Sequence, residues 1–371
     1  MHRARGTLTR ANHQNVNGPP RRTHILARKT PRMATANSEP TQPRRLAFLV
    51  LALGIALAST AAILIEIGHD RYGLATIVLA AGRLGVATLV LSGVVAAWPA
   101  SRRALSEASR RDVVLALLAG WLLAVHFATW FASLAYTSVA SSVTLVSTSP
   151  MFVALGAAWV LKERLPRIAV LGMLLAVAGS AGISLADAGL GADAGEPGAS
   201  RERQPLLGNA LALAGAVAMA GYLLVGRHVR QRLSLVPYIW LTYASAAVVL
   251  LLWSLAAGEG AAWTRIPAVA WWIVLGLALG PQLVGHTSLN WAVRHLPATV
   301  VAVAVLGEPI GSALLAWWLL GQPVTPLQGC SALVLLTGIG LVSRTMSAPA
   351  PAPTTTARAP LPNPATVTGK K

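Results

Sequence analysis

The sequence predicts an all-α integral membrane protein in which ten transmembrane helices form two inverted five-helix repeats. The first observation is composition: 55% of residues are hydrophobic, 11% are charged, and the mean hydropathy is +0.61. These values lie outside the range of soluble globular domains. The second is that apolar stretches of about 20 residues, the length that crosses a hydrocarbon core of about 30 Å, recur along the chain. The lipid bilayer is therefore the first expected partner.

Five such stretches, separated by charged or turn-rich breaks, are expected in each half of the chain. In the first half they cover residues 46–66, 74–98, 113–135, 142–161 and 168–185. In the second half they cover residues 206–226, 238–257, 269–293, 299–320 and 327–342.

The longest internal loop, residues 186–204, is rich in Gly, Ala and Asp and separates repeat 1 (45–185) from repeat 2 (205–346). Aligning Pro150 with Pro309 sets Ser-Pro-Met-Phe-Val-Ala-Leu against Glu-Pro-Ile-Gly-Ser-Ala-Leu and brings Gly179 opposite Gly338. Because each half crosses the membrane an odd number of times, the second half must run opposite to the first.

The two ends, a basic segment over residues 1–44 and a Pro/Ala/Thr-rich segment over residues 347–371, are expected to be disordered. A long polar stretch before the first apolar run argues against a cleavable signal peptide, and translation starts at Met1 or at Met33. The net charge of +18 comes from tails and short loops without interleaved aromatics, so nucleic-acid binding is not expected. With Cys330 as the single cysteine, neither a disulfide nor a cysteine-based metal site is expected.

Basic residues alternate between loops, which predicts the orientation because cytoplasmic loops are enriched in Lys and Arg. The loops after the second, fourth, sixth and eighth stretches are basic, whereas the opposite loops hold six of the 12 acidic residues. Both termini are therefore expected in the cytoplasm, and the protein in the cell (inner) membrane as a multi-pass chain. The basic loops contain Arg102, Arg103, Arg110, Arg111, Lys162, Arg164, Arg167, Arg227, Arg230, Arg232 and Arg294.

Three charged residues are predicted inside the apolar stretches: Glu66, Arg83 and Glu308. An ionised group there costs about 2.5–3.5 kcal/mol on insertion scales, so it normally faces a cavity or a partner. Arg83 is expected to neutralise Glu66, Glu308 or a carboxylate of the solute. Glu66 at a headgroup position and Glu308 at the aqueous edge are the alternatives.

Two histidines stand at related places in the repeats, His126 24 residues before Pro150 and His286 23 residues before Pro309. Each either lines a cavity, where it binds solute or titrates near neutral pH, or is a neutral imidazole that bonds a backbone carbonyl. Trp130 follows His126 by one helical turn.

Polar stripes mark two of the predicted helices. Gln282, His286 and Asn290 share one face at i, i+4 and i+8, and Ser141, Thr144 and Thr148 share another. Such faces favour water or solute, although Ser and Thr also bond their own helix backbone.

Pro150 and Pro309 are expected to break the fourth and ninth helices and to free backbone carbonyls, which are tolerated beside protein or water. Matching breaks in two repeats indicate a solute site, with a simple packing kink as the alternative. The aromatic faces of Trp130 and Tyr222 suit an apolar group or a cation, or else interhelical packing.

Several runs resemble the EamA-type family of the drug/metabolite transporter superfamily between residues 45 and 344. They are the third-stretch run 118–140 with Gly120, His126, Trp130 and Tyr136; the run from Ser147 through Pro150 to Glu163, Arg164 and Leu165; Arg83-Leu84; Gly226-Arg227; and Glu308-Pro309 with Gly338. One departure is Gln322, which stands where the family often has Glu.

The resemblance implies a secondary transporter, often an exporter of amino acids or related metabolites, with a central cavity formed by both repeats. We expect alternating access of a small-molecule solute, without enzymatic activity, cofactor or metal, and leave open a homodimer and coupling to protons. A channel or a membrane-embedded enzyme is the alternative, although the chain shows neither an Asp-rich metal motif nor a Gly-x-Ser-x-Gly elbow. The predicted cavity residues are His126, Trp130, Thr148, Tyr222, Gln282, His286, Asn290 and Glu308.

Overall fold

The computed structural model describes residues 42–160, 165–187, 204–292, 296 and 304–346, and every regular element in these ranges is helical. Nine of the helices in this part of the chain are long and apolar enough to cross a membrane. The all-helical membrane class predicted from the sequence is therefore confirmed. The predicted tails and the loop over residues 188–203 lie outside the described residues.

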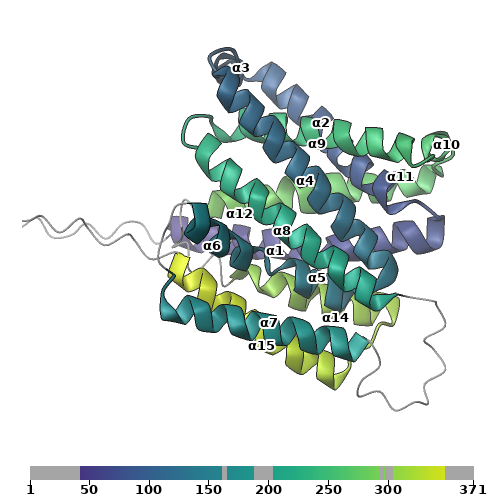
Figure 1. Cartoon of the computed structure of the whole chain (residues 1–371). Coiled ribbons are helices and arrows are strands. Elements are labelled where there is room, and N and C mark those ends of the chain that lie inside the picture. Colours follow the sequence, from purple (N-terminus) through teal and green to yellow (C-terminus); the bar gives the residue numbers. More distant parts are fainter. Residues whose placement is uncertain (1–41, 161–164, 188–203, 293–295, 297–303, 347–371) are drawn as a thin grey trace, which may run out of the picture. The chain divides into compact units, whose positions relative to one another are not determined.

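The first repeat contributes five spans and one short surface helix, α3, between the second and third (Figure 1). In chain order the elements are α1 (Gln42–Tyr72), α2 (Thr76–Ala97), α3 (Pro99–Ser106), α4 (Arg110–Tyr136), α5 (Val139–Val146), α6 (Ser149–Val160) and α7 (Arg167–Asp187).

The second repeat follows the same plan, again with a short helix, α10, in a loop. Its elements are α8 (Pro205–Val229), α9 (Leu235–Ala256), α10 (Gly260–Thr264), α11 (Ala268–Leu277), the π-helix η1 (Ala278–Gly285), α12 (His286–Ala292), α14 (Gly307–Leu320) and α15 (Pro326–Met346).

The fourth and eighth spans are less regular than their hydropathy suggests. The fourth is two helices, α5 and α6, separated by a turn at Ser147 and Thr148, with Pro150 in the first turn of α6. The eighth widens into the π-helix η1 around Pro281. Because proline has no N–H and clashes with the preceding turn, an α-helical ladder cannot continue unchanged through it.

The ninth span is described only in its second part. The turn at Leu306 precedes α14, and Pro309 lies in the first turn of that helix, as Pro150 does in α6. Residues 299–303 of the predicted stretch 299–320 lie outside the described part of the chain. Gly321, at a positive φ of 66°, closes α14 in the left-handed conformation that glycine adopts without strain.

Side-chain caps explain where several spans begin. The Ser109 hydroxyl accepts from the Asp112 N–H at 3.1 Å at the start of α4. At the start of α15, the Thr325 N–H donates to Gln328 Oε1 at 2.9 Å, and the Gln328 N–H donates to Thr325 Oγ1 at 3.2 Å. The second pattern is a reciprocal capping box, in which two otherwise unpaired backbone donors are satisfied.

Helix contacts follow the repeat. Three pairs join a span to its counterpart: α2 with α9, α5 with α14, and α7 with α15. The other main pairs come in exchanged sets, in which a contact between two spans is matched by a contact between their counterparts in the other repeat. Thus α4 packs on α8 while α1 packs on α11, η1 and α12, and α5 and α6 pack on α8 while α14 packs on α1. This exchange is what an internal two-fold relation between the repeats produces.

Glycines on α1 and α8 let the exchanged pairs approach closely. A Cβ on Gly54 would lie 2.8 Å from Ser288 Cβ, where α1 crosses α12. A Cβ on Gly215 would lie 3.1 Å from Thr129 Oγ1, where α8 crosses α4. Small residues at such crossings are the usual means of packing helices in lipid.

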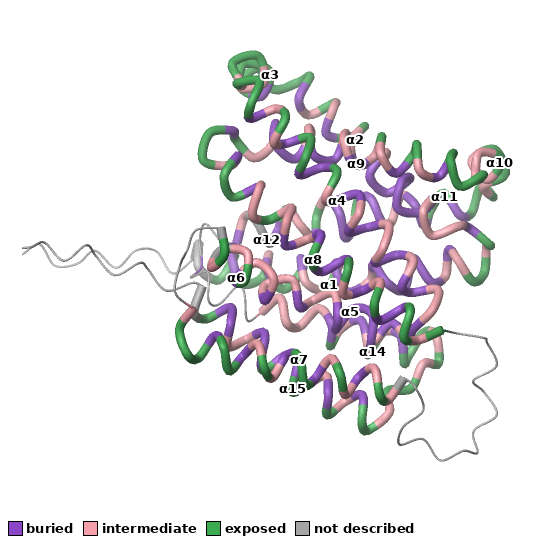
Figure 2. The backbone as a smooth tube through the Cα atoms, in the orientation of Figure 1, coloured by how far each residue is buried: buried purple, intermediate pink, exposed green. Residues whose placement is uncertain are grey.

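Many large apolar residues are exposed on the outside of the bundle. In Figure 2 the buried residues (purple) lie mainly in the interior of the bundle, and the exposed residues (green) lie mainly at its periphery. Exposed leucine and valine face lipid in a membrane protein, so their exposure carries no hydrophobic penalty there. Six exposed tryptophans of the described residues lie near the ends of spans, the position that amphipathic rings take at membrane interfaces. They are Trp98, Trp159, Trp271, Trp272, Trp317 and Trp318.

Candidate functional site: a polar cavity between the repeats

A cavity of about 350 Å³ lies among helices of both repeats. Its wall includes three positions from α4, and residues from α1, α2, α6, α8, α9, η1, α12, α14 and α15. The residues that carry chemistry in the wall are Arg83, His126, Trp130, Tyr222, Tyr243, His286 and Glu308. Most other wall residues are apolar, so the polar groups stand out as directional contacts.

Arg83 of α2 is only 1% exposed, and three neighbours fix its guanidinium. Its Nε–H donates to Gln282 Oε1 at 2.7 Å. Its Cζ lies 4.6 Å from the ring centre of Phe127 and 5.8 Å from that of Phe131. Cation–π contacts of this kind stabilise a buried guanidinium without neutralising it.

Glu308, half-buried at the start of α14, lines the same cavity as Arg83 and attracts it electrostatically. The sequence offered Glu66, Glu308 or the solute as the counter-charge of Arg83, and of the two carboxylates only Glu308 belongs to the wall among the described residues. A positive and a negative group thus share one enclosed space.

His126 bonds a backbone carbonyl and also faces the cavity, so the two alternatives considered for it are not exclusive. Its Nδ1 lies 2.9 Å from the Gly215 carbonyl oxygen of α8. Since a carbonyl only accepts, Nδ1 carries the proton, and Nε2 of the neutral ring is an acceptor. The ring stacks on Trp130 with centroids 5.8 Å apart and planes 20° from parallel.

His286 lies at the junction of η1 and α12 and lines the same cavity. The two histidines that correspond in the repeats therefore converge on one space. Trp130 is buried on the α4 wall, and its Nε1 has no hydrogen-bond partner among the described residues. Tyr222 of α8 stacks on Tyr238 with centroids 6.3 Å apart.

Two of the predicted cavity residues are absent from the wall, and the side chain of a third is not described. Gln282 lies behind the wall, 2% exposed, where it supports Arg83 beside Tyr243. Thr148 is fully buried in the turn between α5 and α6 and donates to the Leu145 carbonyl of α5 at 2.7 Å, so its hydroxyl is satisfied by the preceding helix. Asn290 belongs to α12, but its side chain lies outside the described part of the chain.

The two prolines that correspond in the repeats line different hollows of the structure. Pro150 lines the cavity, whereas Pro309 lines an apolar groove between α5, α14 and α15. Ser141 and Thr144 of the predicted polar stripe face that groove as well.

Glu66 lies near the end of α1 and is 4% exposed. It accepts a hydrogen bond from Gln322 Nε2, and Gln322 Oε1 accepts from the Val139 N–H at 3.1 Å. A glutamine donates and accepts at once, so it connects α1 to the start of α5 in a way that a glutamate in its place does not.

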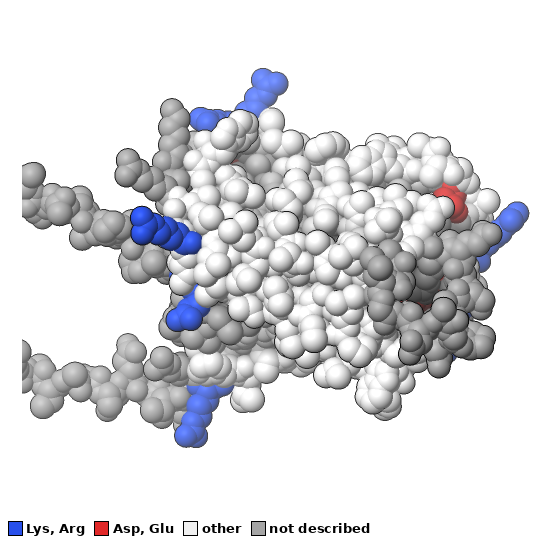
Figure 3. Space-filling view, turned by 60° about the horizontal axis from the view of Figure 1, so that its bottom comes forward, with Lys and Arg blue, Asp and Glu red and all other residues white. Residues whose placement is uncertain are grey.

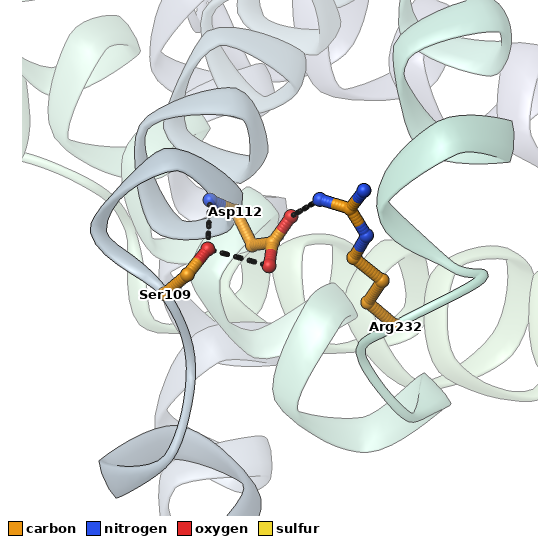
Figure 4. A network of polar contacts seen from close by, with 3 residues as sticks. All are labelled: Ser109, Asp112 and Arg232. Carbon is orange, nitrogen blue, oxygen red and sulfur yellow. Dashed lines mark hydrogen bonds and ion pairs between the residues drawn. The ribbon is translucent and has the colours of Figure 1, made fainter.

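At the opposite end of the bundle, Asp112 joins α4 to the residues that follow α8 (Figure 4). It accepts from Ser109 Oγ at 2.6 Å and lies 3.4 Å from Arg232 Nη1. Arg232 is largely exposed, so the ion pair is worth only about 0–1 kcal/mol.

Sequence reasoning missed Phe127 and Tyr243, which complete the surroundings of Arg83. Aromatic residues in an apolar stretch resemble ordinary packing residues. The sequence did contain one signal for the surroundings of Arg83. Pro281 lines the cavity, disturbs the eighth helix and immediately precedes Gln282.

Comparison with known proteins gives three likenesses. The profile of the EamA-like transporter family matches residues 45–185 and again residues 206–344. The "Uncharacterized transporter sll1319" of Synechocystis sp. (strain ATCC 27184 / PCC 6803 / Kazusa) is 25% identical over 240 residues, which are 62% of this chain and 66% of the relative, just under two thirds of its length.

A solved structure described only as "Crystal structure of protein" superposes with a TM-score of 0.52 at 21% identity. The match covers 82% of this chain and 98% of that one, and it supports the fold alone.

Proposed function

This chain belongs to the EamA-like transporter family, and on that premise we propose that it is a secondary transporter that exports a small organic metabolite, such as an amino acid or a related compound, by alternating access. In this proposal the two repeats rock around the cavity between them and open it to one side of the membrane at a time.

The observation that carries the proposal is the shared cavity itself. Its polar groups come from both repeats, with Arg83 and His126 from the first and His286 and Glu308 from the second. A space built by two halves changes its access when the halves move, which is the requirement of a carrier. Its volume of about 350 Å³ suits a small molecule.

We propose His126, Trp130, Tyr222, His286 and Glu308 as solute-binding residues, with Gln282 in a supporting place. The sequence also predicted Thr148 and Asn290; the Thr148 hydroxyl donates to a carbonyl of the preceding helix, α5. Arg83 is treated with the further inference below.

The proposed orientation has both termini in the cytoplasm of a cell with an inner membrane. In Figure 3, a basic side chain projects from the right end of the described bundle, and Lys and Arg side chains lie mostly toward its left end. Arg102, Arg103, Arg110 and Arg227 belong to elements that begin or end there. The positive-inside rule makes that end cytoplasmic.

Reconstitution of the full-length protein in liposomes tests the function. Candidate solutes come from comparing the media of cells with and without the gene. A carrier gives saturable uptake and accelerated exchange when the same solute is inside, whereas ohmic conductance without counterflow supports the channel alternative. Chemical conversion of the solute supports the membrane-embedded enzyme. If neither flux nor exchange exceeds that of empty liposomes, the transport proposal fails.

A further inference from the structure

The guanidinium of Arg83 is buried with most of its hydrogen-bonding capacity unused. Arginine has about five N–H donors. Among the described residues, only the Nε–H is engaged, by Gln282, and the buried Nη1 is without an acceptor. A charged group removed from water with unpaired donors costs several kcal/mol, so such an arrangement is maintained where a ligand or a reaction uses it.

The direction of the unused donors is set by the groups around Arg83. Gln282 holds the Nε edge, and Phe127 covers one face of the plane. Gln282 lies beside Tyr243 and stands in the π-helix η1 directly after Pro281. Nη1 is itself buried, so with one edge and one face occupied, Nη2 is the donor that remains for the cavity that Arg83 lines.

We propose that Arg83 binds an anionic carboxylate of the solute and that Gln282 is its positioning residue. This inference rests on the proposed transport function and narrows its substrate class to carboxylates. A carboxylate accepts two parallel N–H bonds from a guanidinium, which no hydroxyl or amide matches.

Glu308 limits the charge of that anion. It lies in the same cavity as Arg83, so a compact dianion such as phosphate meets repulsion that a monoanionic carboxylate, with its charge drawn to Arg83, meets less strongly. Next to the polar groups, the aromatic and apolar side chains of Phe127, Trp130 and Met219 form the wall. The expected solute therefore pairs a carboxylate with an apolar or aromatic body.

Matched probes isolate the carboxylate. The full-length protein in detergent is heated with 3-phenylpropanoate or 3-phenylpropanamide, with L-phenylalanine or L-phenylalaninamide, and with inorganic phosphate. The rise in unfolding temperature with concentration gives an apparent Kd for each. We expect each carboxylate to bind about 10 to 100 times more tightly than its amide, and phosphate to bind more weakly than the carboxylates.

Variants then assign the preference to residues. We expect Arg83→Gln to bring the acid-to-amide affinity ratio close to one, Arg83→Lys to keep part of it, and Gln282→Leu to lower it. Arg227→Gln, which removes an exposed positive charge outside the cavity, is the matched control and keeps the ratio. Glu308→Gln removes the competitor for Arg83 and should tighten binding of 3-phenylpropanoate, a gain that misfolding does not produce.

An acid-to-amide ratio of one in the unaltered protein, or an unchanged ratio in Arg83→Gln, overturns the proposal. So does the absence of stabilisation by every carboxylate. If liposomes still show counterflow of a solute without a carboxylate, the anion site is wrong and the transport function stands. If liposomes show no flux while the carboxylates bind through Arg83, the transport function fails and the site remains.

Discussion

The histidines of the cavity, His126 and His286, occupy corresponding positions in the two repeats, yet their backbone settings differ. His126 lies within the regular helix α4 and bonds the Gly215 carbonyl, whereas His286 is the first residue after a π-helix. π-helical turns are frequent at functional sites, and the second repeat has such a turn directly before His286 where the first repeat continues as a regular helix through His126.

Replacing either histidine tests whether it acts on the solute. We expect His126→Ala and His286→Ala to lower counterflow in liposomes severalfold, because each substitution removes a hydrogen-bonding ring from the cavity wall. His126→Gln keeps hydrogen-bonding groups and should retain more activity than His126→Ala. His228→Ala, at an exposed position after the cavity region of α8, is the control. Unchanged counterflow in both alanine variants removes the histidines from the mechanism.

At single positions, the sequence predicted which buried residues are polar better than it predicted which way their side chains point. The cost of a buried charge made Arg83 and Glu308 candidates, and both line the cavity. Thr148 was grouped with Ser141 and Thr144 by helical spacing. The turn between α5 and α6 ends α5 before Thr148, so the three residues do not share one helix face. Spacing along one helix predicts a shared face only as far as that helix continues.

Between elements, the tightest crossing joins α7 and α15. A Cβ on Gly338 would lie 2.4 Å from the Gly172 carbonyl oxygen and 2.6 Å from the Ala176 nitrogen. Both are backbone atoms, which cannot turn aside as a flexible side chain does. The fifth and tenth spans thus depend on glycine at their contact.

Adding one methyl group at this crossing should separate the helices. We expect Gly338→Ala to destabilise the protein by about 1–3 kcal/mol through overpacking, measured as a lower unfolding temperature in detergent. Gly85→Ala in α2, where a Cβ meets nothing within 4 Å, is the matched control and should be neutral or slightly stabilising. Equal stability of Gly338→Ala and the unaltered protein would show that α7 and α15 adjust freely.

Helix breaks were partly predictable from proline. Pro150 predicted an interruption of the fourth span, and the chain does turn just before it, at Ser147 and Thr148. Pro281 produces a different result, because the helix widens to a π-helix instead of ending. Sequence alone does not separate these outcomes, since the choice depends on whether neighbouring helices, here α1 and α2, hold both sides of the break together.

At the level of the whole molecule, the inverted relation of the repeats could be predicted by counting the membrane crossings in each half. Two matches to one family profile and the exchanged helix contacts agree with it. Which helices pack together could not be predicted from the sequence. Hydropathy gives the number of crossings, but not that α1 packs on η1 and α4 on α8. Contacts between apolar helices in lipid depend on local shape, which composition does not encode.

Reporter fusions test the orientation of the whole chain. We expect a fusion after Gly195, or one in the loop before α11 at Arg265, to report the extracytoplasmic side. Fusions after Ser109 and after Arg344 should report the cytoplasm, because the basic residues lie mostly at that end (Figure 3). A cytoplasmic signal from the Gly195 fusion would refute the proposed topology.

The exchange of helices between repeats also sets the order in which this chain can be assembled during synthesis. The first helix leaves the ribosome about 200 residues before α11, η1 and α12, its partners. At translation rates of about 5–20 residues per second, α1 waits on the order of 10 to 40 s in the membrane with its contact face, around Gly54, open to lipid. A ribosome that stalls within the second half therefore leaves a nascent chain in which this face of α1 still lacks its partner helices.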